Sequence, residues 1–508
     1  WEMKPDDFDN LEDGAALKAM LKQLVELVES LQGTIQSLQQ TIENKDGELA
    51  ELRRLVFGQK SERMPSVQSE LKKRRTAKQQ KADRDKTKQK RDAARKAKQE
   101  LPTETIRHDL DEESLCCPHC GGTDFVDLPD EISFESEFVP ARLIRIEHCR
   151  QKKACRCGQY VATGPAPVRV SEGVQYGPGL HAHVVVSKCL DSMPLYRQAR
   201  SLSRAGVKIS RSSLCDLFHR AADLLDPLHK RTLELIKNSK YVRADETPQP
   251  VMDKDKTHRG YMWNFNTEDL VAYVFSPGRS GETAAAVLGD SQGFLLADAY
   301  SGYNRVTTPE KRTRVGCWAH VRRKFFDAKN LAPEECKHAI DAILALYEVE
   351  YQAAGDNLLG SDKHLALRKA RSKVVIDDLH RWLEEQKDRF APQSPVGRAI
   401  RYPLNHWKSL IRFLEDPKLP LDNNMSERLL RAIALGRKNY LWVGNNGAGH
   451  NLAVLQSLVS SCQINGVDPQ AYLSDVLIRI QSHPQSQIDE LLPNRWQPHE
   501  SPSIAATE

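Results

Sequence analysis

The sequence lacks long hydrophobic runs, and only 6% of its 508 residues are aromatic. No stretch of about 18 apolar residues occurs, which excludes an ordinary membrane-spanning helix. The first ten residues are acidic and have no signal-peptide pattern, so we expect a cytoplasmic protein. Its 11 cysteines are then expected to be thiols or metal ligands rather than a disulfide framework.

The small net charge of +5 conceals an uneven distribution along the chain. Residues 1–70 have 8 basic and 14 acidic side chains, whereas residues 71–100 have 14 basic and 4 acidic ones. The basic excess therefore lies in one block, and a polyanionic partner is expected there. The length predicts roughly two to four domains.

Residues 15–57 have a hydrophobic heptad repeat that is typical of a coiled coil. The a positions are Leu21, Val28, Ile35, Ile42, Leu49 and Val56, and the d positions are Leu17, Leu24, Leu31, Leu38, Lys45 and Leu52. This pattern favours a parallel two-stranded coil that would join two copies of the chain. An amphipathic helix packed on its own domain is the alternative.

Residues 58–104 are predicted to form a solvated helix or a disordered linker, because their basic residues have almost no apolar company. We expect this segment to neutralise DNA phosphates without reading the base sequence. The basic run at its centre begins with Lys72, Lys73, Arg74 and Arg75. A linker that only keeps the protein in solution is the alternative.

Six cysteines fall between residues 116 and 157 and predict a small zinc-binding domain over 105–170. Cys117 and Cys120 have the spacing of a zinc knuckle, and Cys155 and Cys157 form a second pair. Four thiolates would close a tetrahedral structural site. Because the second pair is tighter than usual, the alternatives for the fourth ligand are Cys149, Cys116 and His148.

Residues 175–238 are predicted to be helical. An apolar face runs from Leu195 to Ala205, Gly206 makes a turn, and Ser210 is placed to cap a second helix. This outline fits a DNA-binding helix-turn-helix, and an ordinary helical hairpin fits it equally well.

Residues 239–440 change to a pattern of strands and helices. Strands are predicted at 241–245, 260–265, 270–275, 293–298 and 315–318, with a helix at 280–288. Two of the strands end in an acid, Asp245 and Asp298, and open α/β sheets present their chemistry at strand ends. Neighbouring carboxylates repel each other unless a cation lies between them, and Mg²⁺ suits such ligands.

A third acid, Glu427, is expected in the first turns of a helix capped by Asp422 or Asn423. Cations suited to phosphate binding lie close to it in the sequence and also follow His320. These predicted DNA-binding residues are Arg428, Arg431, Arg437, Lys438, Arg322 and Arg323.

Six motifs in these segments resemble bacterial insertion-sequence transposases of family sixty-six. The motifs are Arg243–Pro248, Ala297–Asn304, Cys317–Phe325, Leu421–Arg428, Gly436–Tyr440 and Asn465–Leu473. The resemblance extends over about residues 15–480 and keeps the order of segments in that family, although Cys155-Arg156-Cys157 departs from the family's zinc pattern.

This resemblance implies a multidomain α/β protein with a ribonuclease-H-like mixed sheet. The sheet would lie within 239–440, with a helical insertion at about 328–415, and a helical segment would follow at 441–485. The coiled coil, basic linker, zinc-binding domain and helical region would precede it. Residues 486–508 are expected to be a disordered tail.

The resemblance also implies a DNA transposase of the bacterial nucleoid in which Asp245, Asp298 and Glu427 bind catalytic Mg²⁺ or Mn²⁺. Structural Zn²⁺, DNA at the element ends and the target, a second copy of the chain, and small accessory proteins are the implied partners. The alternatives are a dimeric DNA-binding regulator that retains a nuclease-like scaffold, and a nuclease that does not join strands.

Overall fold

The computed structural model describes residues 14–57, 64–74, 84–85, 87–93, 96, 143–154, 156, 159, 161–170, 176–253 and 256–498. Two compact units are formed, one by residues 1–64 and 147–508 and one by residues 65–146, and each is described by itself. Among the helices of these ranges, none is both long enough and apolar enough to cross a bilayer.

Helix α1 (Gly14–Phe57) is continuous over the predicted heptad repeat. In the single chain its predicted core positions are open to solvent, since Leu24, Leu31 and Leu38 are 51%, 53% and 57% exposed. The helix is thus as predicted, while pairing with a second copy stays a prediction.

The second unit contains α2 (Val67–Arg74), in which Leu71 is buried and Lys72, Lys73 and Arg74 are exposed. In the first unit, β1 (Lys152–Ala154) and β2 (Val161–Thr163) form a small antiparallel ribbon. The four predicted zinc ligands, Cys117, Cys120, Cys155 and Cys157, lie outside the described residues, as does Arg75.

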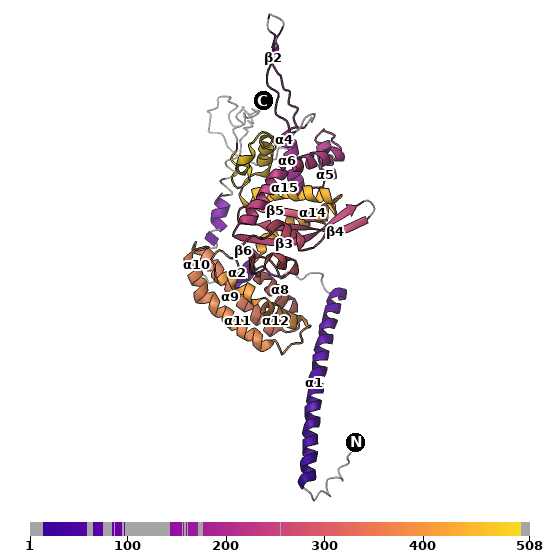
Figure 1. Cartoon of the computed structure of the whole chain (residues 1–508), viewed down its shortest axis with the longest axis vertical. Coiled ribbons are helices and arrows are strands. Elements are labelled where there is room, and N and C mark those ends of the chain that lie inside the picture. Colours follow the sequence, from indigo (N-terminus) through magenta and orange to yellow (C-terminus); the bar gives the residue numbers. More distant parts are fainter. Residues whose placement is uncertain are drawn as a thin grey trace, which may run out of the picture. The chain divides into compact units, whose positions relative to one another are not determined.

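A five-stranded mixed sheet forms the centre of residues 176–498 (Figure 1). Its strands are β3 (Tyr241–Asp253), β4 (Lys256–Asn266), β5 (Val271–Ser276), β6 (Gly293–Leu296) and β7 (Arg312–Val315). They lie in the order β5-β4-β3-β6-β7, with β4 antiparallel to both of its neighbours and β6 parallel to β3 and β7. The predicted mixture of strands is confirmed, but three of the predicted strand ends are wrong. Strand β3 does not end at Asp245 and continues to Asp253, where it pairs with β4, and β6 ends at Leu296, before Asp298. The last strand ends at Val315, and α8 begins at Trp318.

The core on one face of the sheet is formed with helices that precede the strands in the sequence and with helices that follow them. They are α4 (Pro178–Cys189), α5 (Leu195–Arg204), α6 (Arg211–Asn238), α14 (Asn424–Tyr440), α15 (Asn446–Ile464) and α16 (Pro469–Arg479). Val251, Met262, Val271 and Tyr273 of the sheet join this core. Ser210 caps α6 as predicted, its hydroxyl accepting from the Ser213 N–H at 3.0 Å.

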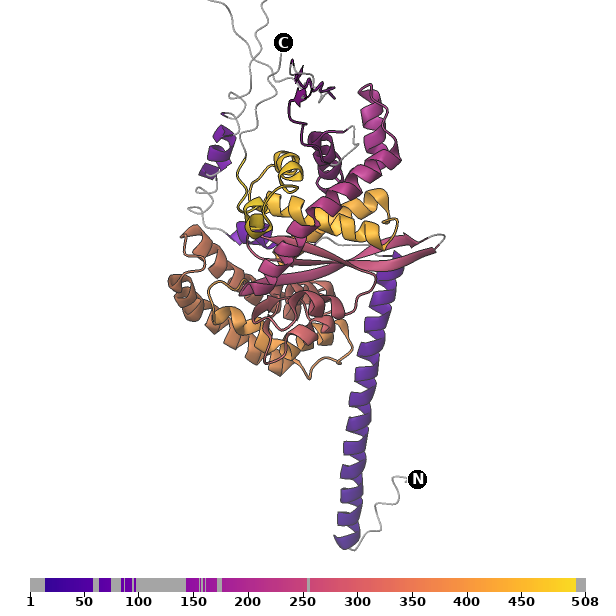
Figure 2. The same cartoon turned by 45° about the horizontal axis from the view of Figure 1, so that its top comes forward.

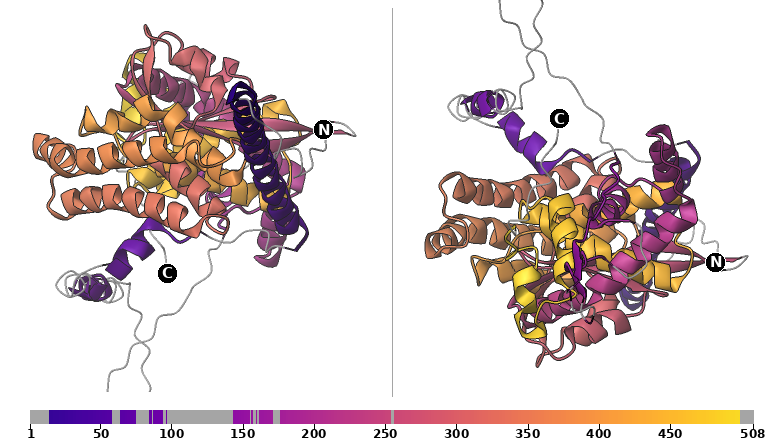
Figure 3. Two further views of the ribbon diagram at one scale, coloured as in Figure 1. Left: turned by 90° about the horizontal axis from the view of Figure 1, so that it is seen from below. Right: turned by 90° about the horizontal axis from the view of Figure 1, so that it is seen from above.

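The opposite face packs on α7 (Glu282–Leu288) and the 3₁₀ helix η3 (Ser301–Val306), with Trp263 and Phe265 in the shared core. Figure 2 shows the sheet between the two sets of helices. The chain between β7 and α14 is helical, and its helices lie side by side in Figure 3. They are α8 (Trp318–Ala328), α9 (Pro333–Gly355), α10 (Asp362–Leu367), η4 (Arg368–Ser372), α11 (Lys373–Gln386), α12 (Pro395–Asn405), α13 (Trp407–Leu410) and η5 (Ile411–Leu414).

The prediction of a disordered tail from residue 486 is wrong for the part up to Trp496. Residues Gln485–Leu491 form η6, and Leu491 and Leu492 are fully buried. The Trp496 indole N–H donates to Asp475 at 2.7 Å, and its ring packs edge-on against Tyr472. Scattered apolar residues in a polar stretch thus suffice to hold it on α16. Residues 499–508 lie outside the described residues.

Candidate active site

The sheet brings two of the three predicted acids to neighbouring strands. Asp245 lies within β3, and Asp298 follows β6 by two residues. In the parallel pair, Arg243 is aligned with Leu296. Asp245 is the second residue after this pair in β3, and Asp298 is the second residue after it in the loop that follows β6.

The third acid, Glu427, is in the first turn of α14, and this helix is fastened to β3 through Asn423. The Asn423 side-chain N–H₂ donates to the Ala244 carbonyl at 2.8 Å, next to Asp245. The Asn423 backbone N–H donates to the Cys317 thiol at 3.3 Å. Asn423 therefore joins three of the sequence motifs at one buried point.

Ser426 makes a second attachment of the same helix turn. Its hydroxyl donates to the Asn423 side-chain carbonyl at 2.8 Å and accepts from the Asn266 amide of β4, also at 2.8 Å. All three side chains are almost completely buried. Since buried polar groups are costly to leave unpaired, this network fixes the turn that carries Glu427.

Asp298 and Glu427 lie close enough to Asp245 to affect the ionisation of its carboxyl group. Burial, followed by the negative charges of Glu246, Asp298 and Glu427, raises the pKa of Asp245 to about 7. One hydrogen bond opposes this rise, since the Glu246 backbone N–H donates to Asp245 Oδ1 at 2.9 Å. Asp245 is thus under electrostatic strain that a bound cation would relieve.

The loop that carries Asp298 is held by Arg314 of β7. Its guanidinium donates to the backbone carbonyls of Asp298 and Tyr300, the latter at 2.7 Å, and to Asn304 Oδ1 at 2.9 Å. The Tyr300 N–H donates to Asp298 Oδ1 at 2.9 Å. Arg314 therefore acts on the loop backbone and leaves the second oxygen of Asp298 uncommitted in these contacts.

Glu246, which follows Asp245, forms an ion pair in which its own side chain is buried and that of Arg279 is 45% exposed. Its side chain is 1% exposed and accepts from Arg279 Nε at 2.9 Å and from the Tyr303 hydroxyl at 2.6 Å. The Arg279 guanidinium in turn lies 4.1 Å from the centre of the Tyr300 ring. These contacts connect β3 to the loop that carries Asp298.

The acids offer the hard oxygen ligands that Mg²⁺ and Mn²⁺ prefer. His320 of α8 adds a nitrogen, with Nε2 lying 4.0 Å from Glu427 Oε1. Over the described ranges, no three His, Cys, Asp or Glu side chains converge closely enough to coordinate an ion. The donor chemistry therefore fits a divalent cation, while binding would have to draw the carboxylates closer together.

The predicted DNA-binding residues of α14 divide into two groups. Arg428, Arg431 and Lys438 are exposed. Arg437 instead turns toward β3, where it donates to the Thr247 hydroxyl at 3.3 Å and to the Pro248 carbonyl. On α8, Arg323 is exposed and Arg322 is only 2% exposed. Arg437 is thus engaged with β3, and Arg322 is buried inside the protein.

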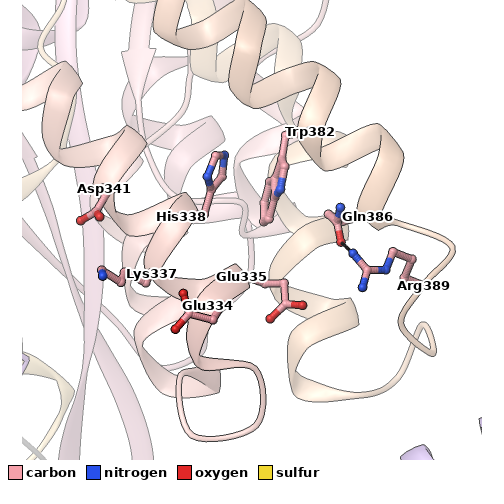
Figure 4. A pocket seen from close by; sticks show the side chains of 8 residues that line it. All are labelled: Glu334, Glu335, Lys337, His338, Asp341, Trp382, Gln386 and Arg389. Atoms are coloured by element: carbon pink, nitrogen blue, oxygen red, sulfur yellow. Dashed lines mark hydrogen bonds between the residues drawn. The ribbon is translucent and has the colours of Figure 1, made fainter.

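A separate cleft of about 410 Å³ lies between α9 and α11 (Figure 4). The rings of His338 and Trp382 face each other in it, with their centres 4.6 Å apart, and Arg389 donates to Gln386 at 2.7 Å. Carboxylates of Glu334, Glu335 and Asp341 also line the cleft. It includes none of the predicted catalytic or DNA-binding residues.

Comparison with known families matches three segments of the chain. Residues 173–451 match the family described as "Transposase IS66 family". This protein belongs to the IS66 transposase family. Residues 114–158 match the zinc-finger binding domain of IS66 transposases, and residues 457–494 match the IS66 C-terminal element. Membership supports a transposase role, binding to DNA, and use of divalent metal and zinc.

Relatives of this IS66 protein in Sinorhizobium fredii align over most of both chains. The protein y4jD is 34% identical over 419 residues, which are 78% of this chain and 81% of y4jD. The protein y4hP is 30% identical over 411 residues, which are 76% and 74% of the two chains. Both bear the description "uncharacterized", so they add no functional detail.

Sequence reasoning missed several residues that shape this IS66 site. Asn423 is a possible helix cap by its position in the sequence, yet its side-chain amide donates to the Ala244 carbonyl of β3. Glu246, Arg279 and Arg314 are not among the candidates that the sequence suggests. A signal existed for Glu246, since a carboxylate directly beside Asp245 in a strand must find a partner if it is buried.

Proposed function

We propose that this protein is a DNA transposase that cuts and rejoins phosphodiester bonds at the ends of an insertion sequence. Asp245, Asp298 and Glu427 are the catalytic residues. One observation carries the proposal: acids from three distant motifs lie near one another beside β3, where burial and then the charges of Glu246, Asp298 and Glu427 raise the pKa of Asp245. Such convergence is characteristic of a functional site rather than of ordinary surface charge.

The fold assigned in this proposal is a ribonuclease-H-like core with a helical insertion. The strand order β5-β4-β3-β6-β7 with β4 antiparallel supports it. The insertion comprises the helices between β7 and α14. This arrangement explains why 129 residues separate Asp298 from Glu427 although both act at β3.

In this proposal the three carboxylates hold two Mg²⁺ or Mn²⁺ ions about 4 Å apart. The ions would activate the attacking water or 3′-hydroxyl and stabilise the leaving oxygen. Asp245 and Asp298 provide oxygens from adjacent strands, and Glu427 approaches from α14. Arg323, Arg428, Arg431 and Lys438 bind backbone phosphates, for which arginine offers a bidentate fork.

The remaining segments bind and pair the DNA ends. The basic stretch that includes Lys72, Lys73 and Arg74 neutralises phosphates, and the zinc domain and α5–α6 bind the element ends. Helix α1 pairs two copies of the chain so that both ends are cut together. Element-encoded accessory proteins assist the reaction.

Cleavage of supercoiled plasmid carrying the element ends tests the proposal. The protein should nick this DNA only with Mg²⁺ or Mn²⁺ and should then form joined products. Asp298→Ala should abolish both reactions, whereas Glu282→Ala, which removes an acid that is 75% exposed, should not. Nicking by Asp298→Ala would refute the assignment. Cleavage without joining would identify a nuclease, and DNA binding without cleavage a regulator.

A further inference from the structure

The exposed side of α14 forms one row of residues that leads away from Glu427. Residues spaced alternately by four and three lie on a single face of an α-helix. Five exposed residues follow this spacing, and one further step of four reaches Trp442 just beyond the helix. The row is Asn424, Arg428, Arg431, Leu435, Lys438 and Trp442.

The row has a positive charge that is not neutralised within the protein. After Glu427, the next acidic residue in the sequence is Asp468. Within the described part of the chain, Arg428, Arg431 and Lys438 have no ion pair or hydrogen bond to a side chain. Three free cations at helical spacing match the phosphates of a nucleic acid backbone.

Trp442 stands out among the tryptophans of the described residues because it is the most exposed, at 39%. The adjacent Leu441 is 53% exposed. Trp263 and Trp318, by contrast, are fully buried in the same domain. An apolar pair kept in solvent at the end of a basic row indicates a surface that is covered when a ligand binds.

The turn that presents Trp442 is rigid. The backbone N–H groups of Leu441 and Trp442 donate to the carbonyls of Arg437 and Tyr440, both at 2.8 Å. Val443 then pairs with β3, donating to Pro250 at 3.0 Å and accepting from Met252 at 2.8 Å. Leu441 has φ of +66°, which is unfavourable for a branched side chain. The fold thus maintains a strained turn that holds Trp442 outward.

We propose that Trp442 stacks on an unstacked base of DNA whose phosphates lie along Arg428, Arg431 and Lys438. Aromatic rings stack on bases of any sequence, and apolar side chains beside them can wedge base steps apart. Thirteen residues of helix from Glu427 to Tyr440 measure about 20 Å. For duplex DNA that runs along α14, this length corresponds to roughly six nucleotides between the contacted base and the scissile phosphate. This inference rests on the proposed function for the position of that phosphate.

Binding of full-length protein to two labelled DNA probes tests the inference. One probe is a fully paired duplex, and the other is the same duplex with one unpaired base. Calcium replaces magnesium to prevent cleavage. Wild-type protein should prefer the unpaired base, and Trp442→Ala should lose about tenfold in affinity for that probe with little change for the duplex. Trp442→Phe should retain most of the preference because it keeps a ring.

Leu359→Ala is the matched control, because it removes an exposed apolar side chain, 58% exposed, from the helical insertion. It should bind both probes as wild type does. Equal binding of Trp442→Ala and wild type to both probes would overturn the inference. Plasmid nicking by wild type in the same preparation separates the two proposals, since it reports on the proposed function alone.

Discussion

The side-chain amide of Asn423 donates a 2.8 Å hydrogen bond to the carbonyl of Ala244, the residue before Asp245. This contact fixes the first turn of α14, and with it Glu427, against the strand that carries the first acid. Residues 179 positions apart in the chain are thereby held in one place. We therefore propose that the geometry of the candidate active site depends on this amide.

Replacing Asn423 by alanine should therefore impair both folding stability and cleavage. The change removes the donor to the Ala244 carbonyl and the acceptor of the Ser426 hydroxyl in a buried region, at a cost of about 1–3 kcal/mol in unfolding free energy. Plasmid nicking should fall at least tenfold at temperatures where the variant is folded. Thermal unfolding and nicking rates check this. Asn405→Ala, which alters an exposed asparagine at the end of α12, should change neither, and a fully active Asn423→Ala would show that the bridge is dispensable.

The raised pKa of Asp245 predicts a pH-dependent gain in stability for Asp245→Asn in metal-free protein. In the unfolded chain this carboxyl has its ordinary pKa of 3.8, whereas in the folded protein its pKa is about 7. Below pH 4 the carboxyl is protonated in both states, so Asp245 costs the folded protein no stability relative to a neutral residue. As the pH rises from 4 to 7 only the unfolded chain ionises readily, and stability is lost. Asparagine should stabilise the protein by on the order of 4 kcal/mol at pH 8 and hardly at pH 4.

Thermal unfolding of both proteins at pH 4 and pH 8 in a chelating buffer measures this difference. Adding Mg²⁺ at pH 8 should stabilise the wild type and have little effect on Asp245→Asn, because the cation binds only the folded carboxylates. If Asp245→Asn were less stable than wild type at pH 8, the raised pKa of Asp245 would be contradicted.

Glu246→Gln should lower stability and cleavage together. It removes the charge that pairs with Arg279 and Tyr303 in a site where Glu246 is 1% exposed. Loss of a buried charged hydrogen bond costs about 1–3 kcal/mol, and the Asp298 loop loses its tie to β3. Chemical denaturation and nicking rates measure the two effects.

Glu282→Gln provides the control for this substitution. Its partner Arg305 lies 3.7 Å away, and both side chains are exposed, so its effect should not exceed about 1 kcal/mol. Equal effects of the two substitutions would show that the Glu246 network has no special role.

Dimer formation through α1 is tested by introducing a charge at Leu31. Its side chain is 53% exposed in the single chain and would be buried between paired helices. Leu31→Glu should convert a dimer into a monomer in sedimentation equilibrium. Ser30→Glu adds the same charge outside the predicted seam and should leave the dimer intact. A monomeric wild type would refute the pairing.

Metal analysis tests the zinc site. One Zn²⁺ per chain is expected, and Cys117→Ser should lose it because three ligands hold the ion poorly. Loss with Cys155→Ser and Cys157→Ser would confirm the predicted four-thiolate set. Retention of zinc by Cys155→Ser would indicate that the fourth ligand is Cys149, Cys116 or His148. Cys215→Ser, outside the matched zinc-finger segment, should retain zinc.

Much of the sheet could be predicted from the sequence. The strands around Asp245, residues 260–265 and residues 270–275 are confirmed, as is the Ser210 cap, because these depend on local hydrophobic pattern and side-chain chemistry. The buried tail at Gln485–Trp496 was missed because its apolar residues follow no period and find their partners in the core shared with α6 and α16, far away in the sequence.

The directions of the basic side chains could not be predicted from spacing alone. Arg437 and Lys438 are adjacent in the sequence, but Arg437 bonds to β3 while Lys438 is exposed. Arg322 and Arg323 differ in the same way. Consecutive residues of a helix point about 100° apart, and which direction faces the protein depends on what packs there.

The sequence by itself determined which residues can do chemistry: three acids, a set of cysteines and a basic block, each in a local pattern. Tertiary structure alone decided that Asp245, Asp298 and Glu427 lie within electrostatic reach, that Asn423 fastens them, and that Trp442 faces outward. The physical reason is that secondary-structure patterns depend on neighbours in the chain. Carboxylate convergence depends instead on strand order, helix packing and buried hydrogen bonds between residues far apart in the chain.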